Sequence, residues 1–152
     1  MKNKKANVSE FSFKECDIDD YDIIINIWDK AGLRYKPKGR DSKEKIEEEM
    51  QRGVGTFFIV YINNTPAGCI LATHDGRKGW INRLAVLPEF RRMRIASALV
   101  RHAEKHLEKL GMEIITCLIE GWNETSMKLF SSLGYTKHED VFYFSKRKNK
   151  DV

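Results

Sequence analysis

The feature that most constrains the fold is an apolar strand followed by a loop and a long amphipathic helix. Residues 80–87 favour a strand, and Pro88 stops it. From Ile95 the inward positions recur at helical spacing for four turns, until a glycine ends the pattern. These positions are Ile95, Ala98, Leu99, His102, Ala103, His106, Leu107 and Leu110. The next apolar run, residues 114–119, predicts a strand buried on both faces and parallel to the first.

The chain before this unit predicts an antiparallel meander with two helices. The alternation over residues 11–16 indicates a half-buried strand, and residues 56–62 and 67–73 flank a turn as in a hairpin. One helix is expected from Asp19 or Asp20 to Gly32, and a second, capped by Asp41, to about Arg52. After the long helix we expect a short helix capped by Asn123 and a last strand over 141–145. The fold class is therefore α/β, with a mixed sheet in one domain, residues 1–152.

Composition excludes several classes of protein. The hydrophobic fraction of 41% matches ordinary globular chains, and the longest apolar stretch is too short to span a bilayer. The basic start of the chain lacks the apolar segment of a secretory signal, so we expect a cytoplasmic protein without a membrane partner. The net charge of +5 suggests an anionic partner. Residues 1–9 and 147–152 are expected to be flexible basic tails.

Neither cysteine nor histidine spacing predicts a metal site. Cys16, Cys69 and Cys117 have no pairwise spacing typical of zinc ligands, and we expect reduced, mostly buried thiols. His102 and His106 lie four residues apart, but no third ligand accompanies them, so partly buried, hydrogen-bonded imidazoles are the better interpretation.

The loop before the long helix has the chemistry of a phosphate site. A helix N-terminus presents unpaired N–H groups and a partial positive charge. Here Arg91, Arg92 and Arg94 come directly before it. A solvated basic loop is the alternative interpretation.

Two segments of the chain resemble the GNAT superfamily of N-acetyltransferases. Residues 84–99, LAVLPEFRRMRIASAL, are similar to the family's acetyl-CoA signature, in which Leu-x-Val-x-Pro leads into Arg/Gln-x-x-Gly-x-Gly/Ala at a helix start. Residues 123–135, NETSMKLFSSLGY, are similar to its second segment, Asn-x-x-Ala-x-x-Leu-Tyr followed by Gly-Phe or Gly-Tyr. The resemblance covers residues 11 to 146. It implies a splayed mixed sheet flanked by helices and an enzyme that uses acetyl-CoA as co-substrate.

The resemblance also implies site residues. The backbone of Leu84, Ala85 and Val86 would pair with the pantetheine arm, and the Leu84 N–H, at a strand bulge, would polarise the thioester carbonyl. The pyrophosphate would be held by Arg91, Arg92, Met93, Arg94, Ile95, Ala96 and Ser97. Asn123, Ser126 and Phe130 would line the thioester end.

The sequence departs from the family pattern at two positions. Arg94 replaces the first motif glycine, and we expect weakened but surviving cofactor binding. Phe130 replaces a tyrosine that in many members protonates the leaving CoA thiolate, and a phenyl ring has no proton to donate. Tyr135 and Tyr143 are nominal replacements, although a structural role suits each better.

The general base is not at the family's usual positions. Those positions are Trp80 and Leu118 here, so Glu120, two residues after Leu118, is our first candidate. His74 and Asp75 are weaker alternatives. Trp80 and Asn82 are candidates for the acceptor side of the cleft.

The expected activity is acetyl transfer from acetyl-CoA directly to a primary amine in a ternary complex. The acceptor stays open among a protein N-terminus, a lysine and a small-molecule amine. The basic residues of loop 36–41 would favour an acidic group on it, although a solvated loop is the better interpretation. The alternative is a non-catalytic acyl-CoA-binding module. A nucleic-acid partner is not expected, because no aromatic platform accompanies the charge. The oligomeric state stays open, with a homodimer among the options.

Overall fold

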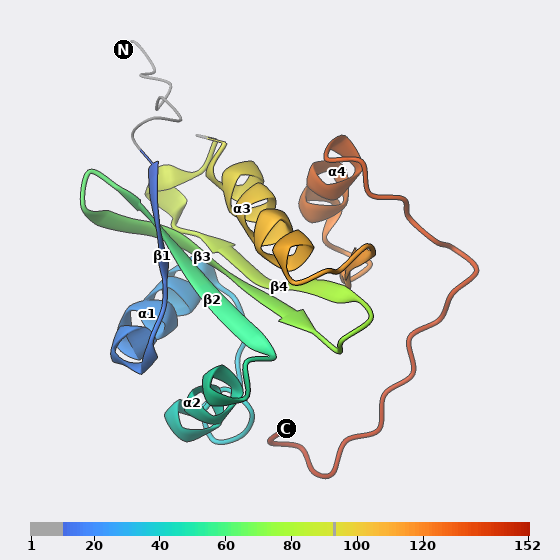
Figure 1. Cartoon of the computed structure of the whole chain (residues 1–152), viewed down its shortest axis with the longest axis horizontal. Helices are drawn as coiled ribbons and strands as arrows, with labels where there is room; N and C mark the ends of the chain where they lie inside the picture. The colour runs from blue at the N-terminus through green and yellow to red at the C-terminus, as the bar shows by residue number, and fades with distance from the viewer. Residues whose placement is uncertain (1–10, 93) are drawn as a thin grey trace.

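The computed structural model describes residues 11–92 and 94–152, whose five strands form one sheet with helices on both faces (Figure 1). The strands are β1 (Phe11–Glu15), β2 (Gly55–Ile62), β3 (Thr65–His74), β4 (Gly79–Val86) and β5 (Ile115–Cys117). They lie in sequence order, antiparallel from β1 to β4 and parallel between β4 and β5. The predicted mixed α/β sheet is confirmed.

The four α-helices start and stop close to the sequence signals. They are α1 (Tyr21–Ala31), α2 (Lys43–Arg52), α3 (Ile95–Lys109) and α4 (Glu124–Ser132), with short 3₁₀ turns at Ile18–Asp20 and Pro88–Phe90. Gly32 and Gly53 end α1 and α2 with φ of 76° and 69°, a left-handed conformation that glycine adopts without a Cβ penalty.

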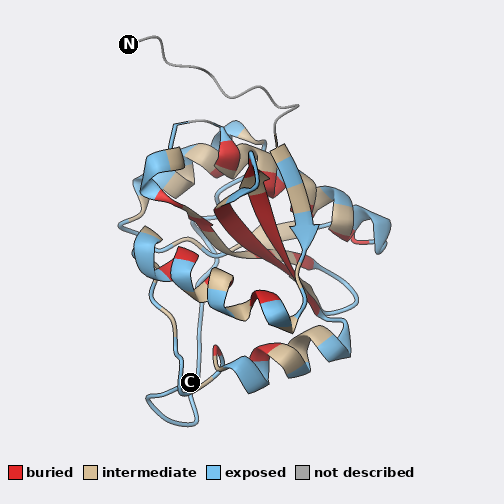
Figure 2. Ribbon diagram, turned by 90° about the vertical axis from the view of Figure 1, so that its left-hand side faces the viewer, coloured by how far each residue is buried: buried red, intermediate tan, exposed pale blue. Residues whose placement is uncertain are grey.

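The sheet separates two apolar cores because neighbouring residues of a strand point to opposite faces. Along β2, Phe58 and Val60 pack with α3, whereas Phe57 and Ile59 pack with α1 and α2. Figure 2 shows the buried strands enclosed between the helical layers. Burial on both faces fixes the register, since a slip of one residue would exchange the two cores.

Three local predictions were wrong. The side-chain cap of α2 is Ser42, not Asp41, because the Asp41 carboxylate is buried and paired elsewhere. The strand after α3 is not buried on both faces: β5 has only three residues, and Ile114 and Leu118 are exposed at its ends. Residues 141–145 form no strand, since no neighbouring strand lies beside them, and they run through solvent after α4.

The two chain ends differ from the predicted pair of tails. Residues 1–9 lie outside the described part of the chain. Residues 147–152 do not stand free: the Lys36 ammonium donates to the Lys150 carbonyl at 3.0 Å, and a Cβ on Gly39 would collide with the backbone of Asp151.

Candidate active site

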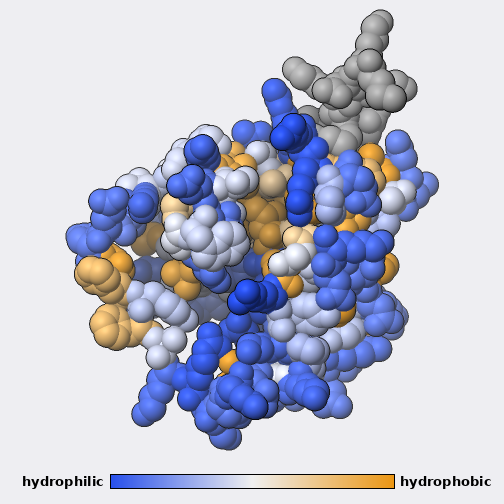
Figure 3. Space-filling view, turned by 180° about the vertical axis from the view of Figure 1, so that it is seen from behind, coloured by the Kyte–Doolittle hydropathy of each residue, from blue (hydrophilic) through white to orange (hydrophobic). Residues whose placement is uncertain are grey.

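The candidate site is a cleft that opens where β4 and β5 separate. The two strands pair only from Gly79 with Ile115 to Ile81 with Cys117. Strand β4 then continues to Val86, while the chain after Cys117 turns away. The space between them belongs to a cleft of about 890 Å³. Figure 3 shows the molecule hollowed on this face, with hydrophilic side chains at the rim.

A β-bulge shapes the wall that β4 contributes. Cys69 of β3 faces Ala85, but Leu71 faces Asn82, so two residues of β4, Arg83 and Leu84, oppose one residue of β3. Arg83 has φ of 52°, which turns the strand at this point. The expected bulge is therefore present, and Leu84 lines the cleft.

The cleft brings together five of the residues predicted to bind acetyl-CoA or to take part in the transfer. Leu84 lies on one wall; Glu120, Asn123, Ser126 and Phe130 lie on the opposite one. Asn123 also caps α4, since its side-chain oxygen accepts the Ser126 N–H at 3.1 Å. Ala85 is buried in the core on the α1 side, so only its backbone is available to a ligand.

The loop before α3 keeps the backbone shape of a glycine turn without the glycine. Arg92 and Arg94 have φ of 65° and 61°. Arg94 is the N-cap of this 15-residue helix and makes no side-chain cap, so among the described residues the capping position supplies no acceptor to the first N–H groups of α3. Ile95 is buried, whereas Ala96 and Ser97 are partly exposed. Met93 lies outside the described residues.

Two carboxylates face the cleft without an ion-pair partner among the described residues. Glu120 accepts the indole N–H of Trp122, and both line the cleft. The sequence interpretation missed Glu49, which lies on α2 and lines the cleft. Its carboxylate packs against Gly55, because a Cβ added to that glycine would lie only 2.6 Å from a carboxylate oxygen. Burial raises the pKa of Glu49, Asp41 raises it further, and Arg83 opposes the shift.

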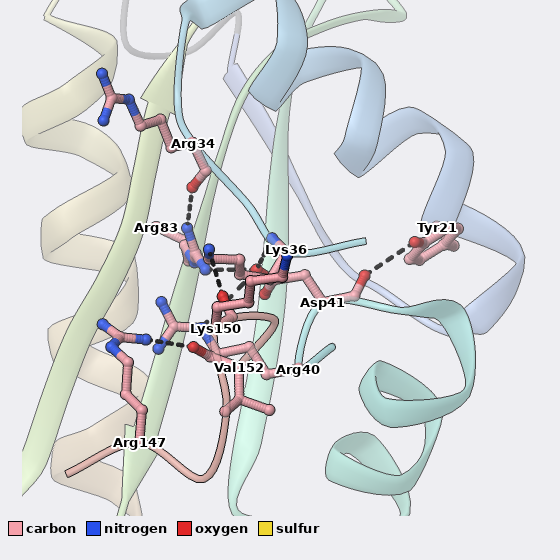
Figure 4. Close-up of polar contacts among 9 residues, drawn as sticks. All are labelled: Tyr21, Arg34, Lys36, Arg40, Asp41, Arg83, Arg147, Lys150 and Val152. Carbon is pink, nitrogen blue, oxygen red and sulfur yellow. Dashed lines mark hydrogen bonds and ion pairs between the residues drawn. The ribbon is translucent and has the colours of Figure 1, made fainter. Parts of the chain in front are cut away.

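An ion pair ties the α1–α2 loop to the bulge, as Figure 4 shows. The Arg83 guanidinium donates to the Asp41 carboxylate at 2.6 Å and to the Arg34 carbonyl at 2.6 Å. The Lys36 N–H also donates to Asp41, at 2.7 Å, and the Tyr21 hydroxyl donates to the Asp41 carbonyl. Asp41 and Arg40 line the cleft, and Lys36 lies in an adjoining pocket. The loop forms a wall of the site.

Neither Tyr135 nor Tyr143 lines the cleft, and the Cys117 thiol that does line it stays protonated. Phe130 is buried and stacks edge-on against Tyr135, whose hydroxyl donates to Glu104 at 3.0 Å. Tyr143 is exposed on the segment after α4. Cys117 lines the cleft, but burial raises the pKa of its thiol to about 11, so little thiolate is present at neutral pH.

Several weaker candidates lie outside the cleft. His74 contacts the Gly53 carbonyl, and the Asp75 carboxylate accepts N–H groups of its own turn. Trp80 pairs with Thr116 in the closed part of the sheet and does not line the cleft, whereas Asn82 does. Within the described ranges, no three His, Cys, Asp or Glu side chains are grouped to hold a metal, and no helix is long and apolar enough to cross a bilayer.

Comparison with known families decides the relationship. The acetyltransferase (GNAT) family matches residues 21–135, which include every element from α1 to α4. The chain belongs to this family. The predicted enzyme class, a GNAT acetyltransferase, is confirmed with it.

Solved GNAT structures share the fold at low sequence identity. The aminoglycoside N-acetyltransferase AAC(6')-Iy, in complex with a bisubstrate analogue of CoA, has a TM-score of 0.75 at 18% identity, over 90% of this chain and 98% of that one. The PaiA N-acetyltransferase from Thermoplasma acidophilum, in complex with coenzyme A, has a TM-score of 0.72 at 21% identity, over 87% and 92%. A predicted acetyltransferase from Clostridium acetobutylicum, with acetyl-CoA, has a TM-score of 0.72 at 12% identity, over 89% and 96%.

Proposed function

We propose that this GNAT protein transfers the acetyl group of acetyl-CoA directly to a primary amine in a ternary complex, with residues 1–152 acting as one domain. The observation that carries the proposal is the cleft between the separated strands. It places the Leu84 bulge on one wall and Glu120 on the other. A cytoplasmic location goes with the proposal.

In this proposal, backbone groups supply most of the contacts to acetyl-CoA. The edge of β4 that β5 leaves unpaired, at Leu84, Ala85 and Val86, suits strand-like pairing with the amides of pantetheine. The pyrophosphate suits the N-terminus of α3, where the loop from Arg91 to Ser97 combines N–H groups with guanidinium charge. Asn123, Ser126 and Phe130 then form the wall beside the thioester.

The transfer step needs an oxyanion donor and a base. The amine nitrogen attacks the thioester carbon, the C–N bond forms, and the C–S bond then breaks to release CoA. The Leu84 N–H, at the bulge of β4, stabilises the oxyanion. Glu120 takes the amine proton, directly or through water. Because Phe130 has no proton and the Tyr135 hydroxyl is held by Glu104, the CoA thiolate is protonated by solvent.

The acceptor is a small-molecule or peptide amine. The carboxylate of Glu49 attracts an ammonium group, and solved relatives of the same fold include aminoglycoside acetyltransferases, one of them in complex with sisomicin. A polyamine or amino sugar therefore heads the series to be tested, with lysine peptides and peptide N-termini beside it.

The test is acceptor-dependent release of CoA, followed with a thiol reagent across this series of amines. The proposal expects at least one amine to accelerate release above slow hydrolysis, with the acetylated amine identified by mass. A protein that binds acetyl-CoA but shows no acceleration with any class of amine would instead support the non-catalytic acyl-CoA-binding module, which the missing tyrosine at Phe130 favours.

A further inference from the structure

A second pocket, of about 480 Å³, adjoins the candidate active site beside the loop between α1 and α2. It shares four charged residues with the cleft: Arg34, Arg40, Arg83 and Glu120. Its other lining residues are Leu33, Tyr35, Lys36 and Arg147, the last of which lies on the C-terminal arm, residues 136–152. Figure 4 shows that the cationic side chains of this basic pocket come from the loop, from β4 and from the arm.

Positive charge dominates the basic pocket. Five of its eight lining residues are arginine or lysine, and among the described residues that line it only Glu120 is acidic. The Asp41 carboxylate accepts from Arg83 at 2.6 Å and also lies 3.9 Å from Arg40. Because one carboxylate is shared by two guanidinium groups, the pocket keeps a net positive charge.

Two of the cations have no negative partner. Arg34 and Lys36 form no ion pair within the part of the chain that the structure describes. The Lys36 ammonium donates to the Lys150 carbonyl at 3.0 Å, but a carbonyl carries no net charge to balance it. A concave wall of one sign concentrates ligands of the opposite sign, so this pocket favours an anion.

Acidic groups lie on the side of the cleft. Glu49 and Asp41 line the cleft but not the basic pocket. Lys36 and Arg147 line the pocket but not the cleft, and Glu120 lines both. A molecule that spans the two cavities therefore meets carboxylates at one end and cations at the other, an arrangement that suits an amine with an anionic group.

We propose that the acceptor is a small amine that carries a carboxylate or a phosphate, and that the basic pocket binds this anionic group while the amine lies at Glu120. The inference rests on the proposed function and narrows its acceptor to one class. A guanidinium group presents paired N–H donors that match two oxygens of a carboxylate or phosphate, and Arg34 and Arg40 supply such groups where the two cavities adjoin. Within the amine series, amino acids and phosphorylated amines therefore rank above polyamines and amino sugars without an anionic group.

The first experiment compares amines that differ in the anionic group. Lysine is paired with cadaverine, which lacks the carboxylate, and phosphoethanolamine is paired with ethanolamine, which lacks the phosphate. We expect kcat/KM to be at least about 10-fold higher for the anionic member of one pair, because charge-assisted hydrogen bonds add to the contacts of the amine. The pair that shows the preference distinguishes a carboxylate from a phosphate as the group bound.

Variants of the pocket locate the preference. Arg34→Gln/Arg40→Gln removes two charges from the shared wall and should bring the ratio within the preferred pair close to one, mainly by raising KM for the anionic amine. Lys36→Gln, which changes the pocket alone, should lower the ratio partway. The control Lys30→Gln/Lys43→Gln removes two charges from exposed positions that flank the loop and line neither cavity, and it should keep the wild-type ratio. Equal kcat/KM within both wild-type pairs, or an unchanged ratio in Arg34→Gln/Arg40→Gln, overturns the proposal.

Calorimetry separates this test from that of the proposed function. Phosphoethanolamine and lysine are titrated into the complex with CoA, in which no acetyl group is available for transfer. At least one of them should bind, and its dissociation constant should rise at least about 10-fold in Arg34→Gln/Arg40→Gln. If an anionic amine binds in this way and none is acetylated, the proposed function fails while the basic pocket stands. If both pairs are acetylated without preference, the proposed function stands and the anionic acceptor is rejected.

Discussion

Arg94 carries backbone strain at the start of α3. Its φ of 61° is a left-handed conformation that costs a residue with a Cβ roughly 1–2 kcal/mol, and the family places glycine here. We predict that Arg94→Gly raises the free energy of unfolding by about 0.5–1 kcal/mol, since the greater entropy of unfolded glycine offsets part of the relief. Urea unfolding measures the change.

Arg101→Gly is the matched control. Arg101 is exposed inside α3, so the same substitution there should destabilise the protein by about 1 kcal/mol. The strain argument fails if both variants change stability in the same direction.

Glu120 is tested against a carboxylate close to it in sequence. Glu120→Gln should lower turnover with the best amine by about 100-fold and flatten its rise with pH, because the base that removes the amine proton is lost. Glu124→Gln, at an exposed position in the first turn of α4, should leave both unchanged. Steady-state rates of CoA release across pH measure the effect. A pH profile identical to wild type in Glu120→Gln would remove this residue from the mechanism and turn attention to Glu49.

At the scale of elements, α3 meets the sheet through two histidines. The His102 ring stacks on Phe13 at 4.2 Å and meets Phe58 edge-on, and His106 also packs edge-on against Phe58. No hydrogen bond of either ring is found among the described residues, so aromatic packing replaces the hydrogen bonds expected from the sequence. Both imidazoles therefore pack as neutral rings between α3 and the strands β1 and β2.

This packing makes stability depend on pH. Burial lowers the pKa of both histidines below 6.5, the neighbouring Lys109 lowers it further, and Glu15 opposes the shift at His106. The unfolded chain then binds more protons than the folded one, so their contribution to stability is present above about pH 6.5 and is lost as pH falls through the folded pKa.

We predict that the melting temperature falls between about pH 7 and pH 5, and that His102→Phe reduces this dependence. Melts across this range for wild type and His102→Phe measure the slopes. His138→Phe, exposed on the arm, is the control and should keep the wild-type slope. Equal slopes in all three proteins would contradict the role of α3.

At the scale of the whole molecule, acetyl-CoA should stabilise the fold. Saturation at about 100 times the dissociation constant adds roughly 2.7 kcal/mol, a rise in melting temperature of about 5–10 °C for a chain of this size. Arg91→Glu should lose most of the shift, because a carboxylate replaces a guanidinium beside the α3 N-terminus. Arg101→Glu, at an exposed position inside α3, should retain it. No shift at millimolar acetyl-CoA would show that Arg94 closes the pyrophosphate site.

What the sequence determined by itself is local. Periodicity placed α1 and α3 almost to the residue, and alternation placed β1. Turn signals placed the β2–β3 hairpin, and the motifs at 84–99 and 123–135 indicated the family. These features survive because each depends on residues within one or two turns, whose propensities and faces the tertiary structure did not overrule.

Only the tertiary structure decided which side chains share the cleft. Glu49 and Glu120 are 71 positions apart, and no spacing rule in the sequence relates them. They line one cleft, which opens where β4 and β5 stop pairing. Asp41 is a residue type that caps helices, yet its carboxylate is buried against Arg83, 42 residues away. An ion pair shielded from water is stronger than a helix cap, and Ser42 supplies that cap in its place. Residues 141–145 have the apolar run of a strand but remain unpaired in the described chain, because a strand also needs a neighbour, and an apolar run along one segment does not supply it.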